Sequence, residues 1–262
     1  MAETGDHRIA LAIDGVVATI TLVRPDKLNA LDMEMMLALE RAAHLIETTG
    51  EVLVAIITGT GEKSFCAGGD IEAWSKLSPL DFGLNWIRHG HRALDRLARL
   101  RQPVIAAING HALGGGIELA AAADFRVAEE QVKIGSPETG LGIIPGWSGT
   151  QRLVRRFGPQ VVRRMALAGD VFSAREALEL GLVDQVVAKG SSLAAARELA
   201  ARIAARGPAA TQMVKSLINA AEGEEIERPL EAIAGALAAT TADLKEGIAA
   251  FRDKRKPKFS GK

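Results

Sequence analysis

The sequence predicts an α/β fold, because short apolar segments typical of buried strands alternate with amphipathic segments typical of helices. Apolar runs containing β-branched residues predict strands at residues 16–23, 52–58 and 104–108. Segments with one apolar face or high helix propensity predict helices after Asp32 and at residues 86–100 and 117–123. This order of strand, helix, strand and helix predicts parallel strands joined by right-handed crossovers.

Length and composition limit the class of protein. The chain has 262 residues, 48% hydrophobic and 24% charged, as in ordinary globular domains. Thirty-two basic residues balance 32 acidic ones, so neither a nucleic-acid partner nor an anionic membrane is expected. There is no apolar run of about 18 residues, so no spanning helix is expected. The only cysteine, Cys66, excludes an internal disulfide, and with no apolar secretory signal we expect a cytoplasmic protein.

The first elements follow local signals. Residues 8–13 and 16–23 should form a hairpin through Asp14-Gly15, a turn-forming pair. Asp32 can cap the following helix. The buried face of that helix is expected to carry Met35, Leu39, Ala42, Ala43 and Ile46.

The most informative segment is PVIAAINGHALGGGIE, residues 103–118. A strand should end at Asn109-Gly110, and three glycines should then lead into a helix. Glycines allow a ligand to approach the backbone, and the first N–H groups of a helix point outward at its positive end. Glu118 would lie within one turn of that site. The alternative is an ordinary loop with a glutamate that merely favours the helix dipole.

A second glycine-rich turn, Ala67-Gly68-Gly69, follows the strand at 52–58. If the two strands are neighbours, N–H groups from both turns can converge on one oxygen as an oxyanion hole. Glu138 lies 20 residues after Glu118 (138 − 118), and the intervening chain could bring the two carboxylates together for acid–base chemistry. The alternative for Glu138 is a solvated loop carboxylate, and for Cys66 a small buried apolar residue.

We expect no metal site. None of the histidines has ligand spacing with acidic partners, so all are interpreted as structural or surface residues: His7, His44, His89, His91 and His111.

The second half of the chain becomes helical. After a glycine- and proline-rich loop at 135–153, Ser173 and Glu176 form a capping-box pattern. Short strands are expected at 125–128, 132–134 and 182–187. A shift toward alanine and leucine near residue 190 predicts a core domain at 1–190 and a helical C-terminal subdomain at 191–262.

Several motifs together resemble the crotonase family, the enoyl-CoA hydratase/isomerase superfamily. They are FCAGGDI at 65–71, INGHALGGGIELAAAADFRVA at 108–128, GSPETGLGIIPGWSGTQRL at 135–153, SAREALELGLVDQVV at 173–187 and EGIAAFRDKRKPKF at 246–259. The resemblance covers nearly the whole chain. It implies a spiral of ββα units with a helical C-terminal region that trimerises, and a homo-oligomer that is a trimer or a hexamer.

The resemblance also implies roles for individual residues. The N–H groups of Gly69 and Gly115 would bind a thioester oxygen, and Glu118 and Glu138 match the two catalytic glutamates of enoyl-CoA hydratases. Residues matching the contacts to CoA and the acyl group are Lys27, Leu28, Ala30, Ala67, Asp70, Ile71, Trp147, Phe251 and Lys254.

Because both glutamate positions are filled, the resemblance favours hydration of 2-enoyl-CoA to 3-hydroxyacyl-CoA, as in fatty acid β-oxidation. CoA would arrive with the substrate, and no other cofactor is expected. The alternatives are an isomerase, a hydratase for a branched or aromatic acyl group, and a catalytically idle acyl-CoA-binding scaffold; RNA binding finds little support in the balanced charge. Two departures from the family pattern are Glu72, where a lysine is common, and Trp147-Ser148, where two glycines are more usual.

Overall fold

The structure is a computed structural model that describes residues 4–225 and 227–262, with the backbone alone for residues 227–230. The chain forms two compact units, of which the first ends at Gln212 and the second is Met213–Lys262. The predicted division after residue 190 stays a prediction.

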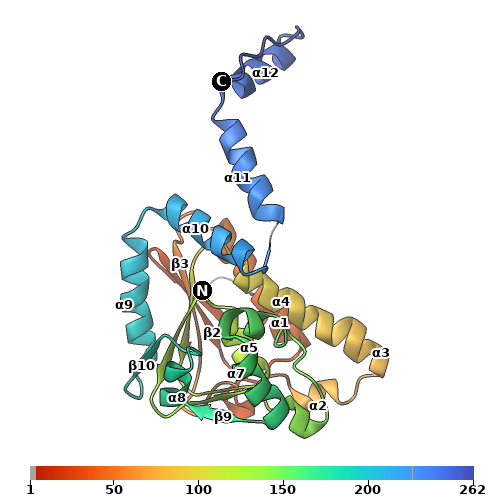
Figure 1. Cartoon of the computed structure of the whole chain (residues 1–262), viewed down its shortest axis with the longest axis vertical. Coiled ribbons are helices and arrows are strands. Elements are labelled where there is room, and N and C mark those ends of the chain that lie inside the picture. The colour runs from red at the N-terminus through yellow and green to blue at the C-terminus, as the bar shows by residue number, and fades with distance from the viewer. Residues whose placement is uncertain (1–3, 226) are drawn as a thin grey trace. The chain divides into compact units, whose positions relative to one another are not determined.

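The larger sheet of the first unit has six strands in the order β1-β2-β3-β5-β7-β10. They are β1 (Ile9–Asp14), β2 (Val17–Leu22), β3 (Val54–Gly59), β5 (Val104–Ile108), β7 (Phe125–Glu129) and β10 (Gln185–Val187). Figure 1 labels β2, β3 and β10 among them. All neighbouring pairs are parallel except β1 and β2. The β1–β2 hairpin turns at Gly15 and Val16, one residue later than expected, and Gly15 has the positive φ of +56° that such turns require.

A smaller second sheet consists of three-residue strands in the order β4-β6-β8-β9. They are β4 (Ser64–Cys66), β6 (His111–Leu113), β8 (Lys133–Gly135) and β9 (Val171–Ser173). β3, β5 and β7 of the first sheet are each followed by a strand of the second sheet and then by a helical segment. The described chain therefore repeats a ββα unit, which confirms the predicted fold class.

Two long helices cover one side of the large sheet's hydrophobic core. α1 (Met33–Thr48) begins at its cap Asp32, whose carboxylate accepts the Met35 N–H at 3.0 Å. The predicted apolar face of α1 is buried. α4 (Arg88–Ala98) packs against α1, and a π-helical segment, η2 (Phe82–Ile87), precedes it, so this helical region begins earlier than the predicted residue 86.

Strand β3 is covered on both faces, as its continuous apolar sequence predicts. Ala55 and Ile57 belong to the main core, whereas Val54 and Ile56 pack with Ala196 of α9 (Ser192–Ala204) in a second cluster. Burying one such aliphatic side chain contributes roughly 1.5–3 kcal/mol. This two-sided burial fixes β3 in the sheet. The carboxyl ends of β3 and β5 lead into β4 and β6, and the glycine turns directly follow those two short strands.

The remaining elements are short helices and the C-terminal helices. The predicted capping box at Ser173 and Glu176 is present at the start of α8 (Ala174–Glu179). The others are η1 (Pro25–Lys27), α2 (Ile71–Trp74), α3 (Pro79–Asp81), α5 (Gly115–Ala121), η3 (Glu138–Leu141), α6 (Arg152–Phe157), α7 (Pro159–Arg163), η4 (Arg164–Ala168), α10 (Pro208–Ala221), α11 (Glu227–Ala239) and α12 (Ala242–Arg252).

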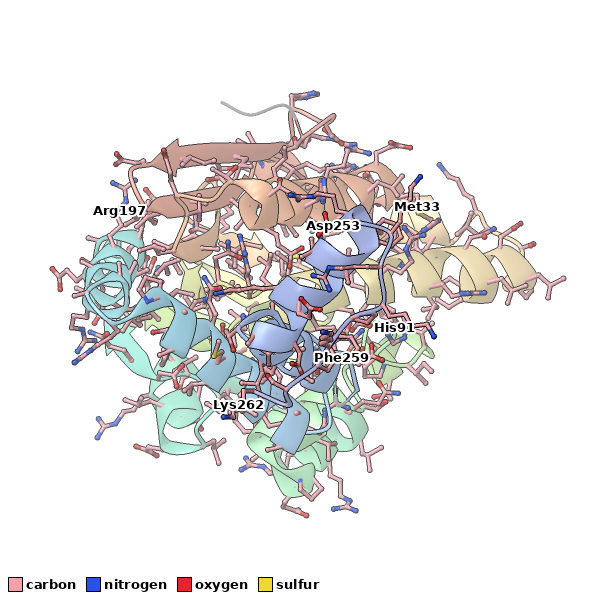
Figure 2. The ribbon with its side chains drawn as sticks, turned by 90° about the horizontal axis from the view of Figure 1, so that it is seen from above. Met33, His91, Arg197, Asp253, Phe259 and Lys262 are labelled. Carbon is pink, nitrogen blue, oxygen red and sulfur yellow. The ribbon has the colours of Figure 1, made fainter. Side chains whose placement is uncertain are left out.

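In the second unit the chain end folds back onto α12. The Asp243 carboxylate accepts N–H groups of Ser260 at 2.6 Å and Gly261 at 2.8 Å, and Phe259, marked in Figure 2, lies beside Gly247. The predicted trimerisation through this region stays a prediction. Among the described residues, no helix combines the length and apolar character that crossing a membrane requires.

Candidate active site

The two glycine turns lie against each other, as their position after neighbouring strands predicts. β3 and β5 pair in parallel, with Ile56 opposite Ile105, and so do β4 and β6, the short strands that the two turns directly follow. A β-carbon on Gly68 would lie 3.0 Å from the backbone nitrogen of Gly115, so the first turn touches the start of α5. Gly68 has a φ of +99°, in the region that favours glycine.

The backbone N–H groups of Gly69 and Gly115 donate to no acceptor within the described chain. Gly115 is the first residue of α5, so its N–H has no intrahelical acceptor. Free N–H groups on two adjoining turns are the donors that an oxyanion hole needs.

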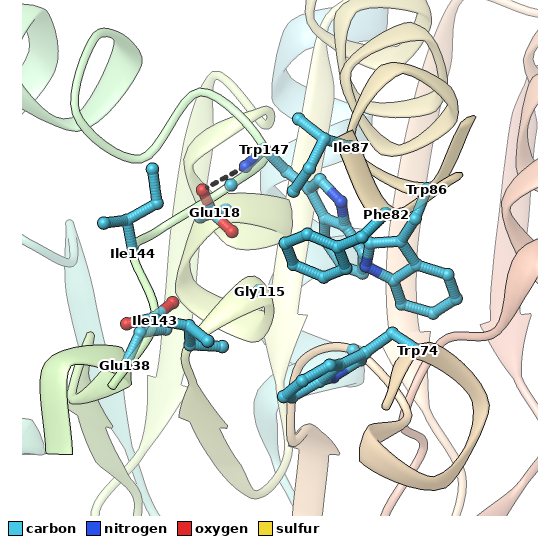
Figure 3. A pocket seen from close by; sticks show the side chains of 12 residues that line it. Trp74, Phe82, Trp86, Ile87, Gly115, Glu118, Glu138, Ile143, Ile144 and Trp147 are labelled. Carbon is cyan, nitrogen blue, oxygen red and sulfur yellow. Dashed lines mark hydrogen bonds between the residues drawn. The ribbon is translucent and has the colours of Figure 1, made fainter. Parts of the chain in front are cut away.

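Glu118 lies in the first turn of α5 and is almost completely buried, with 2% of the residue exposed. Its Oε1 accepts the N–H group of Trp147, the dashed line in Figure 3, and the N–H group of Gly149, both at 2.7 Å. This carboxylate is therefore oriented by the loop before α6.

Glu138 opens η3 and is 9% exposed. The Ser136 hydroxyl donates to its Oε2 at 2.8 Å, while Oε1 is buried and has no hydrogen-bond partner in the described part of the chain. A buried carboxyl oxygen without a donor is costly in a core, but it suits a group that exchanges a proton with a ligand. The solvated-loop alternative for Glu138 is therefore wrong.

Burial shifts both carboxyls toward the protonated form, and the charge of Glu138 adds to this shift at Glu118. Burial, reinforced by the nearby Glu138, raises the pKa of Glu118 from 4.5 to about 8, although its two backbone donors and Arg152 act in the opposite direction. Burial also raises the pKa of Glu138, against the hydrogen bond from Ser136. Such a pair retains a proton near neutral pH, and that proton belongs to the pair.

The two glutamates and the two glycines line one pocket of about 340 Å³, part of which is open to solvent. Figure 3 shows aromatic side chains on one side of this pocket and the carboxylates with Ile143 and Ile144 on the other. The other lining residues are Trp74, Phe82, Trp86, Ile87, Gly146 and Trp147. The pocket thus joins acid–base groups to an apolar chamber.

Trp147 forms the inner aromatic wall, with 3% of the residue exposed. Its ring lies against both oxyanion glycines, since a β-carbon on Gly115 would come within 2.6 Å of the ring and one on Gly69 within 3.2 Å. The ring also stands 5.7 Å from Trp86, centre to centre. Trp147 therefore packs beside the expected position of the acyl group.

Most of the predicted CoA-contact residues of the first unit lie around the first glycine turn, Ala67-Gly68-Gly69. The loop after η1 hydrogen-bonds to the turn through Ala67 N–H to Leu28 C=O at 3.1 Å, and Asp70 N–H donates to Leu31 C=O at 2.8 Å. Ala30 lies in the same loop, and Ile71 is half exposed at the start of α2.

Charged side chains in this cluster are paired with one another. The Lys27 ammonium contacts Glu72 at 2.9 Å, which raises the pKa of Lys27. The buried Asp70 caps α2 and contacts Arg24 at 2.7 Å. Asp70 therefore holds the loop in place, and Glu72 forms an ion pair with the Lys27 ammonium.

Phe251 and Lys254 belong to the second unit, where Phe251 is 89% exposed. Their contact with CoA of a neighbouring subunit stays a prediction. Cys66 is buried as expected of a small apolar residue, and burial raises the pKa of its thiol to about 12.

The aromatic chamber was not predicted. Trp74 ends α2, whereas Phe82 and Trp86 lie in η2, whose π-helical turn changes the spacing of its side chains from that of an α-helix. One available signal was Gly90, a glycine inside an amphipathic helix, which often marks a close neighbour.

Comparison with known proteins agrees with this geometry. A sequence model of the family described as enoyl-CoA hydratase/isomerase matches residues 12–262. The chain is 39% identical to a crotonyl-CoA hydratase of Syntrophomonas wolfei over 98% of this chain and 99% of that protein. It is 38% identical to a short-chain-enoyl-CoA hydratase of Clostridium acetobutylicum over 95% of this chain and 96% of that protein. The solved structure of an enoyl-CoA hydratase from Bacillus anthracis superposes with a TM-score of 0.81 at 36% identity, covering 98% of this chain and all of that one.

The chain therefore belongs to the enoyl-CoA hydratase/isomerase family, the crotonase family that the sequence motifs resemble.

Proposed function

We propose that this protein is an enoyl-CoA hydratase that adds water reversibly across the 2,3 double bond of a 2-enoyl-CoA thioester. The observation that carries the proposal is the pair of buried carboxyls, Glu118 and Glu138, in one pocket with the free N–H groups of Gly69 and Gly115. The names of the crotonyl-CoA and short-chain-enoyl-CoA hydratase relatives support it.

In this mechanism the thioester oxygen accepts both glycine N–H groups. When water adds to Cβ, negative charge develops on that oxygen, and the two donors stabilise it at the positive end of α5. Loss of one such donor typically raises a barrier by about 2.7–4 kcal/mol.

The carboxyl pair supplies the proton transfers. We assign Glu118 as the base that takes a proton from water and Glu138 as the acid that protonates Cα. Burial raises the pKa of Glu118 to about 8, so Glu118 retains a proton near neutral pH in the free enzyme, and this assignment requires that proton to move to Glu138 when substrate binds. These groups need no cofactor besides the CoA carried by the substrate.

The proposed acyl group is short. Trp147 lies against the oxyanion glycines, and Trp86 and Ile87 line the pocket beside it. The space for acyl carbons beyond C3 of the substrate is therefore limited on the aromatic side. The loop containing Lys27, Leu28 and Ala30, with the turn at Ala67, would receive the CoA moiety. We further propose a cytoplasmic trimer or hexamer that serves β-oxidation.

The test is the loss of conjugated-enoyl absorbance from crotonyl-CoA, followed by mass spectrometry of the product, across enoyl-CoAs of increasing length and branching. A product heavier by one water, formed fastest from short straight chains, supports the proposal. A 3-enoyl product of unchanged mass would make the protein an isomerase. Binding without turnover of any ester would make it an acyl-CoA-binding scaffold.

A further inference from the structure

The loop that orients Glu118 is a backbone anion site centred on Ser148. Trp147 N–H and Gly149 N–H, on either side of Ser148, donate to the same oxygen of Glu118, each at 2.7 Å. Alternate N–H groups converge on one anion in this way when the residue between them is left-handed. Ser148 is left-handed, with a φ of +75°.

This conformation is unfavourable for serine, because its β-carbon crowds the following carbonyl. Ser148 is also buried, with 8% exposed. Its carbonyl accepts the N–H groups of Gln151 at 3.1 Å and Arg152 at 2.7 Å, which begins α6. Its hydroxyl has a separate partner on another element, Nδ1 of His91 on α4, at 2.9 Å.

Neither His91, labelled in Figure 2, nor Ser148 lines the pocket, so neither side chain would touch a ligand bound there. The charged groups around the ring are Asp95, one turn further along α4, and Arg152 of α6, which contact each other at 2.6 Å. Burial is the main cause that lowers the pKa of His91, so the imidazole is neutral at pH 7 and can share one hydrogen bond with the hydroxyl.

We propose that His91 is a positioning residue that, through Ser148, keeps the N–H groups of Trp147 and Gly149 on Glu118. This inference rests on the proposed hydratase function for its kinetic consequence. The hydrogen bond to His91 compensates for a serine at a position that otherwise suits glycine. Without it the loop relaxes and one or both donors leave the Glu118 oxygen.

The chemical consequence concerns the charge of Glu118. Backbone donors favour the ionised carboxylate, and their loss raises the pKa of Glu118 further. The other charged groups that act on Glu118 are Glu138 from η3, which raises its pKa, and Arg152 from α6, which lowers it. A displaced loop would therefore leave less of the base form near neutral pH and a worse orientation of the remaining carboxylate.

The decisive comparison is Ser148→Ala with Ser148→Gly. Both variants lose the hydroxyl, but only alanine keeps a β-carbon at positive φ. We expect Ser148→Ala to lower kcat about tenfold, the worth of one hydrogen bond, with KM for crotonyl-CoA within about twofold, because the pocket lining is intact. Ser148→Gly should retain several-fold more kcat than Ser148→Ala.

His91 is tested in the same way. His91→Leu should behave like Ser148→Ala, and His91→Asn, whose amide can reach the position of Nδ1, should recover much of the loss. The double variant His91→Leu/Ser148→Gly should exceed His91→Leu in kcat. In the impaired variants the apparent pKa of the limb of the kcat–pH profile that Glu118 controls should rise by about one pH unit.

A spectroscopic readout separates this inference from the proposed function. The infrared band of the protonated Glu118 carboxyl, assigned by its absence in Glu118→Gln, reports the pKa of Glu118 even in a protein without turnover. An upward shift in Ser148→Ala and His91→Leu but not in Ser148→Gly supports the positioning role. Equal pKa values in wild type, Ser148→Ala and His91→Leu would overturn it, as would equal losses in the alanine and glycine variants.

Discussion

A β-carbon on Gly90 would lie 2.0 Å from Nε1 of Trp147, so the indole ring occupies the space in which any other residue at position 90 would place its side chain. Gly90 lies inside α4, where glycine costs about 1 kcal/mol relative to alanine. The close contact explains this helix glycine, because it lets the Trp147 ring reach the oxyanion turns. Positions 90 and 147 are therefore coupled.

The first prediction concerns this coupling. Gly90→Ala should destabilise the fold by about 1–3 kcal/mol, because overpacking outweighs the gain in helix propensity. In the Trp147→Ala background the same substitution should be neutral or stabilising, since the obstructing ring is gone. Urea unfolding of the four proteins in the cycle gives the coupling energy.

Gly83 provides the matched control. It lies in the neighbouring π-helical segment and is exposed, and a β-carbon added there would have open space within 4 Å. Gly83→Ala should therefore be neutral or should stabilise the fold by up to about 1 kcal/mol, the gain in helix propensity alone. If Gly90→Ala were equally mild, or equally harmful with and without Trp147, the two residues would not be coupled.

The second prediction concerns acyl length. Trp147→Ala enlarges the pocket but keeps the backbone N–H that Glu118 accepts. The ratio of kcat/KM for a longer straight-chain enoyl-CoA to that for crotonyl-CoA should rise about 10-fold or more, since one methylene in a closed pocket is worth roughly 10–200-fold. A parallel steady-state comparison of the two esters measures it, and an unchanged ratio would remove Trp147 from the acyl pocket.

The third prediction follows from the raised pKa of Glu118. The folded protein retains a proton on Glu118 between pH 4.5 and about 8, where the unfolded chain has released it. The contribution of this carboxyl to folding is therefore most favourable below pH 4.5 and is lost as the pH rises toward 8. The Tm of Glu118→Gln, which can still accept both backbone N–H groups, should exceed that of wild type by more at about pH 8 than at about pH 5. Thermal unfolding across this range should show that trend, and a constant difference would argue against a raised pKa.

Local sequence signals were sufficient for the elements that organise the site. Apolar runs identified β3 and β5, which pair in parallel, and the glycines further along the chain identified the two turns, which directly follow β4 and β6. A polar residue directly before each helical pattern also identified the helix caps at Asp32 and Ser173. These features depend on near neighbours in sequence, which is where pattern and propensity are informative.

The rest of the site depends on contacts that sequence patterns do not encode. The second sheet has strands of three residues, too short to show a period of two. The left-handed Ser148 hydrogen-bonds to His91, which lies 57 residues away. The close approach at Gly90 becomes visible only when Trp147 fills the space. All three features arise from tertiary packing.

In the proposed mechanism Glu118 and Glu138 act together to hydrate an enoyl thioester. All three tryptophans of the chain line the pocket and the chain has no tyrosine, so tryptophan fluorescence can verify that each variant still binds crotonyl-CoA. The direct measurement is the single-turnover rate of crotonyl-CoA hydration by wild type, Glu118→Gln, Glu138→Gln and the double variant. Each single variant should lose about 10²-fold or more, and the double variant should lose much less than the product of the two, because the carboxyls act as a unit. Wild-type turnover in both single variants, with binding intact, would contradict the two-carboxylate mechanism.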